Sequence, residues 1–276
     1  MKLKSISIQE WFGKEGQGFR WNLERDLNIL KGPNRCGKTT LLRDIQDLIF
    51  PVTCNVTKEP LWKSALTKVM AKVELVDKHS ADDCYVYWLS RDTYPDVYNF
   101  RGYNHTKDNF ITFWDPEAML EIIDAGELCE DNIMGQFAEL KEGEQKKILD
   151  GINYVIFDDK GTKIQQIEEI IDEGKLPSIR FRFTNGEPLY VEDLSFGYKM
   201  LIAMMSYMPM EKDSVFMIDN PELGLCDAWC KRLVLGLQRI NPDCQLIITT
   251  GSDNIGFGNS MYVRNIKDLF INVGGK

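Results

Sequence analysis

A nine-residue segment, GPNRCGKTT at residues 32–40, constrains this chain more than any other feature, because it fits the phosphate-binding pattern GxxxxGK[ST]. The apolar residues at 27–31 predict a strand before it, and the helical spacing of apolar residues after it predicts an amphipathic helix that opens at Gly37. This order directs backbone N–H groups and the positive end of a helix dipole at one anion. We therefore expect a site for a nucleotide polyphosphate; a glycine-rich turn without a ligand is the alternative.

Each residue type in this loop has an expected task. Lys38 would reach the β- and γ-phosphates, the Thr39 hydroxyl would coordinate Mg²⁺, and Thr40 would contact the α-phosphate. We interpret Cys36 as a small filler rather than a redox-sensitive thiol, and we expect the Arg35 side chain to face solvent. The residues expected to surround the polyphosphate ahead of Lys38 are Gly32, Pro33, Asn34, Arg35, Cys36 and Gly37.

A second short segment supplies a carboxylate for the metal. Residues 215–219, VFMID, form an apolar run that ends in Asp219. Four apolar residues and an aspartate are a weak signal alone, but their position after a phosphate loop strengthens it. A carboxylate at the tip of a buried strand beside the loop is the second protein ligand for Mg²⁺ in P-loop proteins. We expect Thr39 and Asp219 to hold the metal together.

The remaining periodicity predicts an α/β fold. Short apolar runs alternate with helical patterns in the last third of the chain, which indicates a parallel sheet covered on both faces. The expected strands lie at 5–8, 18–23, 27–31, 71–76, 84–89, 179–183, 215–218 and 245–250. The expected helices lie at 39–49, 116–124, 136–172 (with a possible break at 154–157), 198–208 and 228–240. Asn185-Gly186 predicts a hairpin turn.

Composition excludes several function classes. The net charge is −9, and residues 116–174, with 16 acidic side chains and 5 lysines, account for all of the negative balance. An acidic chain is a poor candidate for holding DNA alone, so we interpret this segment as a solvated helical face, or else as a docking face for a basic partner. Only two histidines are present, which excludes a histidine-rich metal site. Seven cysteines without a CxxC pair indicate reduced thiols in the cytoplasm.

Two further observations concern partners. No apolar run is long enough for a membrane span, so we expect no membrane partner. Residues 88–115 are rich in aromatic side chains, but acidic residues outnumber basic ones among them. Base stacking needs a positive groove as well as aromatic rings. A packed lobe or a protein interface is therefore the favoured interpretation of this segment.

The motifs together resemble the ABC-type P-loop ATPases, and within them the RecF/SMC/OLD branch. GPNRCGKTT is followed by LSFGYKML (194–201), IDNPELGL (218–225) and IITTGSDN (247–254), in the order of that family, and the first strand leads to an aromatic loop with Trp11 and Phe12. The resemblance implies a P-loop ABC-ATPase head with N-terminal antiparallel β elements, a mainly parallel core sheet and a variable helical lobe.

The resemblance also implies a domain organisation and a mode of assembly. We expect one domain over 1–276, with a nucleotide-binding core at 1–50 and 178–276 and a variable, acidic lobe at 51–177. In this family ATP is held between two subunits, so Ser195 and Gly197 would cap the ATP of a partner copy in a homodimer or higher homo-oligomer.

Departures from the family pattern concern hydrolysis. Asn220 stands where the family has a catalytic glutamate, Gly251 stands where it has a switch histidine, and no glutamine occurs between Gln46 and Gln136 for the Q-loop. An amide cannot accept a proton at neutral pH. We therefore expect ATP and Mg²⁺ to bind and hydrolysis to be slow or absent, with Glu222 as a possible replacement base.

Several functions remain open at this point. The chain has no room for coiled-coil arms and no recognisable nuclease domain after residue 260, so we expect a stand-alone ATPase whose effector, nuclease-like by resemblance, is a second chain. Family association suggests DNA processing, DNA repair or anti-phage defence. The main alternative is a pseudo-ATPase scaffold that holds ATP structurally. A transporter subunit and a P-loop kinase fit the motifs less well.

Overall fold

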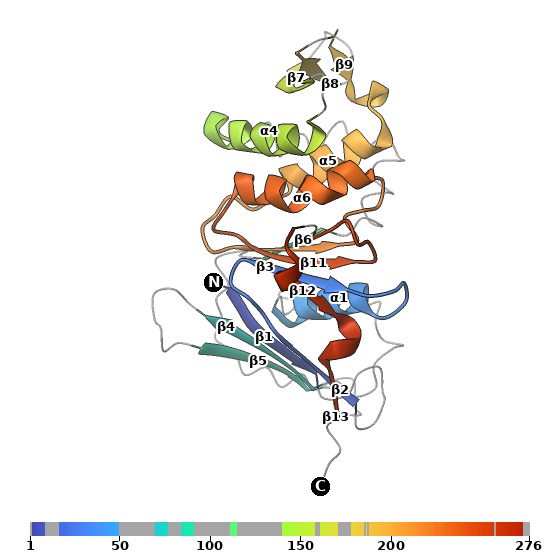
Figure 1. Cartoon of the computed structure of the whole chain (residues 1–276). Helices are drawn as coiled ribbons and strands as arrows, with labels where there is room; N and C mark the ends of the chain where they lie inside the picture. Colours follow the sequence, from blue (N-terminus) through green and yellow to red (C-terminus); the bar gives the residue numbers. More distant parts are fainter. Residues whose placement is uncertain are drawn as a thin grey trace.

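The computed structural model describes residues 2–8, 17–49, 70–76, 84–90, 111–114, 140–157, 161–170, 178–184, 186, 188–256 and 258–272. In this part of the chain the elements stack in layers (Figure 1). An antiparallel sheet lies at one end, followed by helix α1 (Lys38–Ile49), a parallel sheet, three helices and a small antiparallel sheet. The expected α/β fold with N-terminal antiparallel elements and a parallel core sheet is confirmed.

The central sheet is parallel throughout and has the order β12-β3-β11-β10-β6. Its strands are β12 (Val263–Asn265), β3 (Leu27–Lys31), β11 (Gln245–Thr250), β10 (Val215–Asp219) and β6 (Ile111–Trp114). Every residue of β10 and β11 is buried, as their continuous apolar sequences require for a sheet covered on both faces.

Alternate residues of this sheet enter two different hydrophobic cores. Phe216 and Ile218 of β10 pack toward the helical layer, whereas Val215 and Met217 pack on the side of α1 (Lys38–Ile49). This follows from the period of two in a strand, which sends neighbouring side chains to opposite faces. The parallel sheet therefore packs against the helices on one face and against α1 on the other.

Strand β6 comes from the aromatic segment and is a core element. Trp114 at its end is fully buried and makes an edge-to-face contact with Tyr207, with ring centroids 5.5 Å apart. Residues 111–114 are packed, as favoured for this segment, but they form an edge strand of the core sheet beside β10 and not part of a separate lobe. Residues 91–110 lie outside the described part of the chain.

The antiparallel sheet has the order β13-β2-β1-β4-β5. Its strands are β13 (Phe270–Asn272), β2 (Gln17–Asn22), β1 (Lys2–Ile8), β4 (Met70–Val76) and β5 (Cys84–Ser90). Leu3, Ile6 and Ile8 of β1 alternate with more exposed residues and bury themselves against α1 and the parallel sheet. Two strands from the 51–177 segment thus extend a sheet that begins at the N-terminus.

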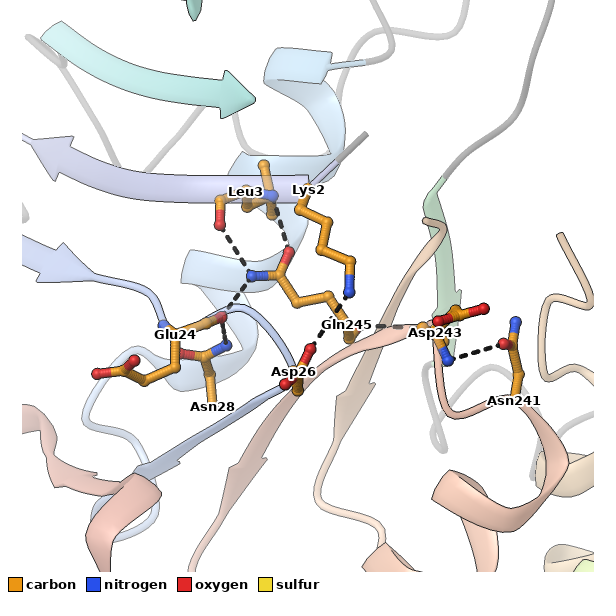
Figure 2. Close-up of polar contacts among 9 residues, drawn as sticks. Lys2, Leu3, Glu24, Asp26, Asn28, Asn241, Asp243 and Gln245 are labelled. Atoms are coloured by element: carbon orange, nitrogen blue, oxygen red, sulfur yellow. Dashed lines mark hydrogen bonds and ion pairs between the residues drawn. The ribbon is translucent and has the colours of Figure 1, made fainter. Parts of the chain in front are cut away.

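A buried amide joins the two sheets (Figure 2). Gln245, at the start of β11, accepts a hydrogen bond from the Leu3 N–H at 2.7 Å and donates to the Leu3 and Glu24 carbonyls at 2.8 and 2.7 Å. Asn28 closes the neighbouring turn through two hydrogen bonds with the Glu24 backbone. The side chain of Gln245 is fully buried, so each of its polar atoms needs these partners.

Three helices lie on the other side of the parallel sheet: α5 (Phe196–Ser206) and α6 (Asp227–Ile240) are nearer to it, and α4 (Glu142–Ile156) packs on their outer side (Figure 1). Helices α4 and α6 approach closely at Gly151 and Gly236. A Cβ added at Gly236 would lie 2.5 Å from Val155 Cγ2, and one added at Gly151 would lie 2.5 Å from Ile240 Cγ1. The helix expected at 198–208 is present and begins two residues earlier.

The prediction of a helix at 136–172 was wrong for the second half of that range. Helix α4 ends at Ile156, and residues Ile164–Ile170 form strand β7, which pairs with β8 (Ser178–Phe183) and then β9 (Leu189–Tyr190). Glu168 of β7 binds Arg180 and Arg182 of β8, and these guanidinium groups hold the pKa of its carboxyl below the usual range. Cross-strand ion pairs thus stabilise a strand whose composition favours a helix.

Other expectations fall outside the described residues: Trp11 and Phe12, the helix at 116–124, and Asn185 of the hairpin. None of the helices in the described part of the chain is long and apolar enough to cross a membrane.

Candidate functional site

The phosphate loop connects the end of β3 to the start of α1. The Gly32 N–H donates to the Thr250 carbonyl at 3.1 Å, which ties the loop to the end of β11. A Cβ on Gly32 would lie 2.7 Å from both Cys36 Sγ and Ile266 Cγ2, so only glycine fits there. Gly37 has φ +95° and Arg35 has φ +63°, and these left-handed positions curl the loop before the helix begins.

Lys38 lies inside the curl of this loop. Its ammonium group donates to the Gly32 and Pro33 carbonyls at 2.9 and 3.0 Å, and the residue is only 4% exposed. The side chain is therefore fixed at the mouth of the loop, where the helix begins. Asn34 and Arg35 are exposed, as expected for Arg35, and Thr40 is half-buried in the first turn of α1.

Asp219 is the charged centre of the site. It is 2% exposed and lies at the end of β10. The Thr39 hydroxyl donates to Asp219 Oδ2 at 2.5 Å, and the Thr249 hydroxyl donates to Asp219 Oδ1. Two hydroxyl donors orient both oxygens of a buried carboxylate, which keeps it hydrogen-bonded where water is excluded.

Thr249 was not among the residues singled out from the sequence. Its place opposite Asp219 follows from the register of two parallel strands, Asp219 of β10 beside Thr249 of β11. The motif IITT alone does not distinguish Thr249 from Thr250, because the sequence does not state which of the two faces the carboxylate.

The donor set fits Mg²⁺. Thr39 and Asp219 present hard oxygen atoms, and magnesium binds through one or two such protein ligands together with water and substrate phosphates. The described residues contain no group of three or more His, Cys, Asp and Glu side chains that would form a site made of protein ligands alone. A metal here would thus depend on phosphate oxygens for its remaining coordination.

The loop after β10 places a second carboxylate at the same edge of the sheet. Asn220 has φ +40°, a left-handed conformation that asparagine tolerates, and its N–H donates to the Thr249 carbonyl at 2.8 Å. The chain then turns, and Glu222 Oε1 accepts a hydrogen bond of 2.7 Å from the Gly251 N–H. Gly251 follows β11 and is exposed. Asn220, Glu222 and Gly251 therefore lie in one cluster beside the phosphate loop.

Gly251 has neighbours at ordinary contact distances. A Cβ there would lie 3.7 Å from Asn34 Oδ1, 3.7 Å from Glu222 Oε1 and 3.8 Å from the Gly32 carbonyl oxygen, all ordinary contact distances. Gly251 is thus close to both the phosphate loop and Glu222, and a Cβ would fit at its position.

Ser195 and Gly197 lie at the start of α5. Ser195 is exposed and its carbonyl accepts the Lys199 N–H, while a Cβ on Gly197 would lie 2.7 Å from the Gly224 carbonyl. Neither of these interactions involves the phosphate loop of the same chain. Two exposed apolar side chains flank this point: Phe196 is 39% exposed and Leu223 is 41% exposed.

The cysteines of the site region are unbridged. Burial, together with the negative charge of Glu222, raises the pKa of the Cys230 thiol to about 12. Burial also raises the pKa of the Cys244 thiol to about 11. Cys36, in the phosphate loop, is half-buried, and Cys226 is exposed at the start of α6.

Comparisons with known proteins agree with this architecture. A family model described as an AAA domain matches residues 1–82, which include the phosphate loop. Among curated proteins, no sequence matches this chain significantly.

Heads of SMC proteins are among the solved structures of similar fold. The SMC head domain from Thermotoga maritima superposes with a TM-score of 0.60 at 14% identity, over 96% of this chain and 94% of that chain. An SMC head bound to the C-winged helix domain of ScpA gives 0.62 at 11% identity, over 94% of this chain and 92% of that chain. A SMC head from Pyrococcus furiosus, with an extended coiled coil and bound to the C-terminal domain of ScpA, gives 0.58 at 10% identity, over 96% and 93%.

These likenesses show the fold, which is that of SMC head domains. Assignment to the OLD-like branch and the stand-alone nature of the protein stay predictions.

Proposed function

We propose that this protein is an ABC-type ATPase that binds ATP with Mg²⁺ and uses it to hold two copies of the chain together. The observation that carries the proposal is the convergence of Lys38, Thr39 and Asp219 at one end of the parallel sheet. Lys38 supplies a positive charge at the mouth of the loop, and Thr39 and Asp219 supply oxygen ligands for the metal. Loop, lysine and metal ligands together suit a nucleoside triphosphate.

Pairing of two copies is supported by the surface around Ser195. Ser195 and Phe196 are exposed at the start of α5, and Leu223 is exposed beside them. A helix N-terminus attracts phosphate, and exposed apolar side chains favour burial in an interface. The γ-phosphate held by one copy would be capped by Ser195 and Gly197 of the other copy, giving a homodimer or a higher homo-oligomer.

We infer slow hydrolysis from Asn220 and Gly251. Neither residue carries a group that accepts a proton from water at neutral pH. Loss of a positioned general base lowers a rate by about 10²–10⁴-fold. ATP would then act as a long-lived clamp, and its slow loss would separate the two copies.

A second protein is the expected recipient of this switch. Two SMC heads of the same fold are bound to ScpA domains in their structures, which supports a protein partner here as well. We propose a nuclease-like effector in DNA processing, DNA repair or anti-phage defence, in the cytoplasm. Direct DNA binding fits less well with a net charge of −9. The alternative is a pseudo-ATPase scaffold that holds ATP permanently. Asn220 and Gly251 support this alternative because neither residue carries a group that accepts a proton from water.

The test combines ATP turnover with the mass of the protein in solution. We expect ATP–Mg²⁺ to increase the mass of the wild type to that of a dimer or larger assembly, with slow turnover. Lys38→Ala should abolish both ATP binding and assembly, whereas Lys212→Ala, which removes an exposed lysine outside the site, should change neither. Equal ATP affinity for wild type and Lys38→Ala would refute the proposed site, and a permanent assembly without turnover would favour the scaffold.

A further inference from the structure

We infer that Glu222 is the catalytic base of this site, in place of the residue after Asp219. The inference rests on the proposed ATP site and adds one named role to it. Glu222 is three residues beyond Asp219, yet its side chain returns to the edge of the sheet where the phosphate loop begins. The turn that brings it there starts at Asn220, whose left-handed conformation reverses the chain after β10.

One oxygen of the Glu222 carboxylate fixes its orientation. Oε1 accepts the Gly251 N–H at 2.7 Å, and Gly251 directly follows β11. The N–H of Gly32 is bonded to the carbonyl of Thr250, the residue before Gly251. The carboxylate is therefore tied, through one residue of backbone, to the first residue of the phosphate loop. A base held in this way has a defined position relative to a bound phosphate chain.

The other oxygen is shielded from solvent and has no hydrogen-bond partner among the described residues. Glu222 Oε2 is buried, and no described residue forms a hydrogen bond with it. An unpaired buried carboxylate oxygen is costly, and such atoms usually mark a position for a ligand or an ordered water. Oε2 is thus a free proton acceptor at the edge of the ATP site.

Gly251 places this carboxylate beside the phosphate loop. A Cβ at Gly251 would lie 3.7 Å from both Glu222 Oε1 and Asn34 Oδ1, which are ordinary contact distances. The Glu222 carboxylate and the loop residue Asn34 therefore both lie next to one exposed glycine. A water held by Glu222 at this point would be close to a phosphate held by the loop.

The step that follows is a hydrolysis in which all atoms balance. A water held by Glu222 attacks the γ-phosphorus of ATP, and the carboxylate accepts one proton from that water. The bond from the γ-phosphorus to the bridging oxygen breaks, and ADP leaves with the electron pair. Inorganic phosphate is released, and Glu222 returns its proton to solvent. Asn220 cannot take this part, since an amide does not accept the proton.

The decisive variant is Glu222→Gln, because a glutamine keeps an acceptor for the Gly251 N–H and loses only the ability to take a proton. Hydrolysis is measured under single-turnover conditions with radiolabelled ATP, ATP affinity by titration calorimetry, and the lifetime of the ATP-bound assembly by light scattering. We expect hydrolysis to fall by about 100-fold, the lower range for loss of a positioned base, while ATP affinity changes little and the assembly persists longer.

Two further variants complete the test. Glu211→Gln changes an exposed glutamate outside the site and should behave as wild type in all three measurements. Glu222→Asp keeps a carboxylate on a shorter side chain and should retain hydrolysis between the wild-type and Glu222→Gln rates. It also provides a comparison if Glu222→Gln is poorly folded.

The outcomes separate this inference from the proposed function. Wild-type hydrolysis by Glu222→Gln, or wild-type hydrolysis no faster than that of Lys38→Ala despite ATP binding, would overturn the role of Glu222 and leave the ATP site intact. Failure of the wild type to bind ATP would overturn the proposed function itself. Loss of ATP affinity in Glu222→Gln, without a specific loss of hydrolysis, would assign Glu222 a structural role and so overturn the inference.

Discussion

Thr39 donates a 2.5 Å hydrogen bond to Asp219, and this contact joins the first turn of α1 to the end of β10 across 180 residues of sequence. It is possible because β3, β11 and β10 are parallel neighbours, so their C-terminal ends meet at one edge of the sheet. Asp219 receives a second hydroxyl bond from Thr249 of the intervening strand. The Asp219 carboxylate is therefore oriented by one hydroxyl from α1 and one from β11, the two elements beside the expected metal position.

The Thr249 hydroxyl is expected to matter for metal-dependent ATP binding. Thr249→Val keeps the shape of the side chain but removes a donor to a buried carboxylate, at a cost of about 1–3 kcal/mol. We expect ATP affinity in the presence of Mg²⁺ to fall by roughly tenfold, with a smaller change when EDTA is present. Calorimetric titration of ATP under both conditions measures this difference.

Thr184→Val is the matched control, because Thr184 accepts a backbone hydrogen bond from Lys163 in the small sheet, well outside the cluster around Asp219. It should leave ATP affinity unchanged. If Thr249→Val binds ATP as tightly as Thr184→Val does, the second hydrogen bond to Asp219 has no part in metal or nucleotide binding.

The crossing of α4 and α6 predicts a stability effect at Gly236. In Gly236→Ala the new methyl group would lie 2.5 Å from Val155 Cγ2 and 3.1 Å from the Gly151 carbonyl oxygen, so the helices must separate. Overpacking of this kind costs about 1–3 kcal/mol. We expect a lower urea midpoint with an unchanged slope.

Gly143→Ala provides the control for that experiment. Gly143 lies in the first turn of α4, and a Cβ there would have no heavy atom within 4 Å. Alanine favours the helix over glycine by roughly 0.5–1 kcal/mol, so this variant should be as stable as the wild type or slightly more stable. Equal midpoints for the two variants would mean that α4 and α6 are not in tight contact in solution.

Much of the fold could be predicted from periodicity. Strands β10 and β11 follow from continuous apolar runs, and β1 follows from its alternation of isoleucine and serine. Strand β6 was missed because its four residues, Ile-Thr-Phe-Trp, are too short to show a period and its pairing with β10 depends on distant residues. Strand β7 was missed because Glu and Gln dominate it, and the arginines that stabilise it lie on β8.

For the candidate site, the sequence could predict which residue types matter but not which of them lie together. The loop motif identified Lys38 and Thr39, and the order of the strands favoured a meeting with Asp219. The bond between Glu222 and the Gly251 backbone has no sequence signal, because it depends on the left-handed turn at Asn220. The Thr249 contact depends on strand register in the same way.

The thiols are expected to differ sharply in reactivity. The pKa of Cys230 is raised to about 12 and that of Cys244 to about 11, so both remain protonated at pH 8, where only thiolates react with alkylating agents. We therefore expect Cys230 and Cys244 to react with the alkylating agent only well above pH 9. Cys226 is exposed and should react in the folded protein. Mass spectrometry after iodoacetamide treatment identifies each site.

Nucleotide should protect one of these thiols. Cys36 lies in the phosphate loop and is half-buried, so ATP–Mg²⁺ bound there would cover it. We expect slower alkylation of Cys36 with ATP and no change at Cys226, which serves as the internal control. Equal alkylation of Cys36 with and without saturating ATP would argue against nucleotide in this loop.

A histidine introduced at Gly251 should speed hydrolysis. The position has room, since a Cβ there meets its neighbours at 3.7–3.8 Å, and Glu222 Oε1 is one of those neighbours. An imidazole beside the Glu222 carboxylate would add a group that can hydrogen-bond to water and to the γ-phosphate. We expect Gly251→His to raise the rate of ATP hydrolysis by about tenfold, below the 10²–10⁴-fold range for an evolved acid or base. Gly251→Ala fills the same space without the imidazole and should leave the rate within about twofold of wild type. A Gly251→His rate no higher than that of Gly251→Ala would mean that the missing side chain does not limit hydrolysis, and that the slow step lies elsewhere in the ATP cycle.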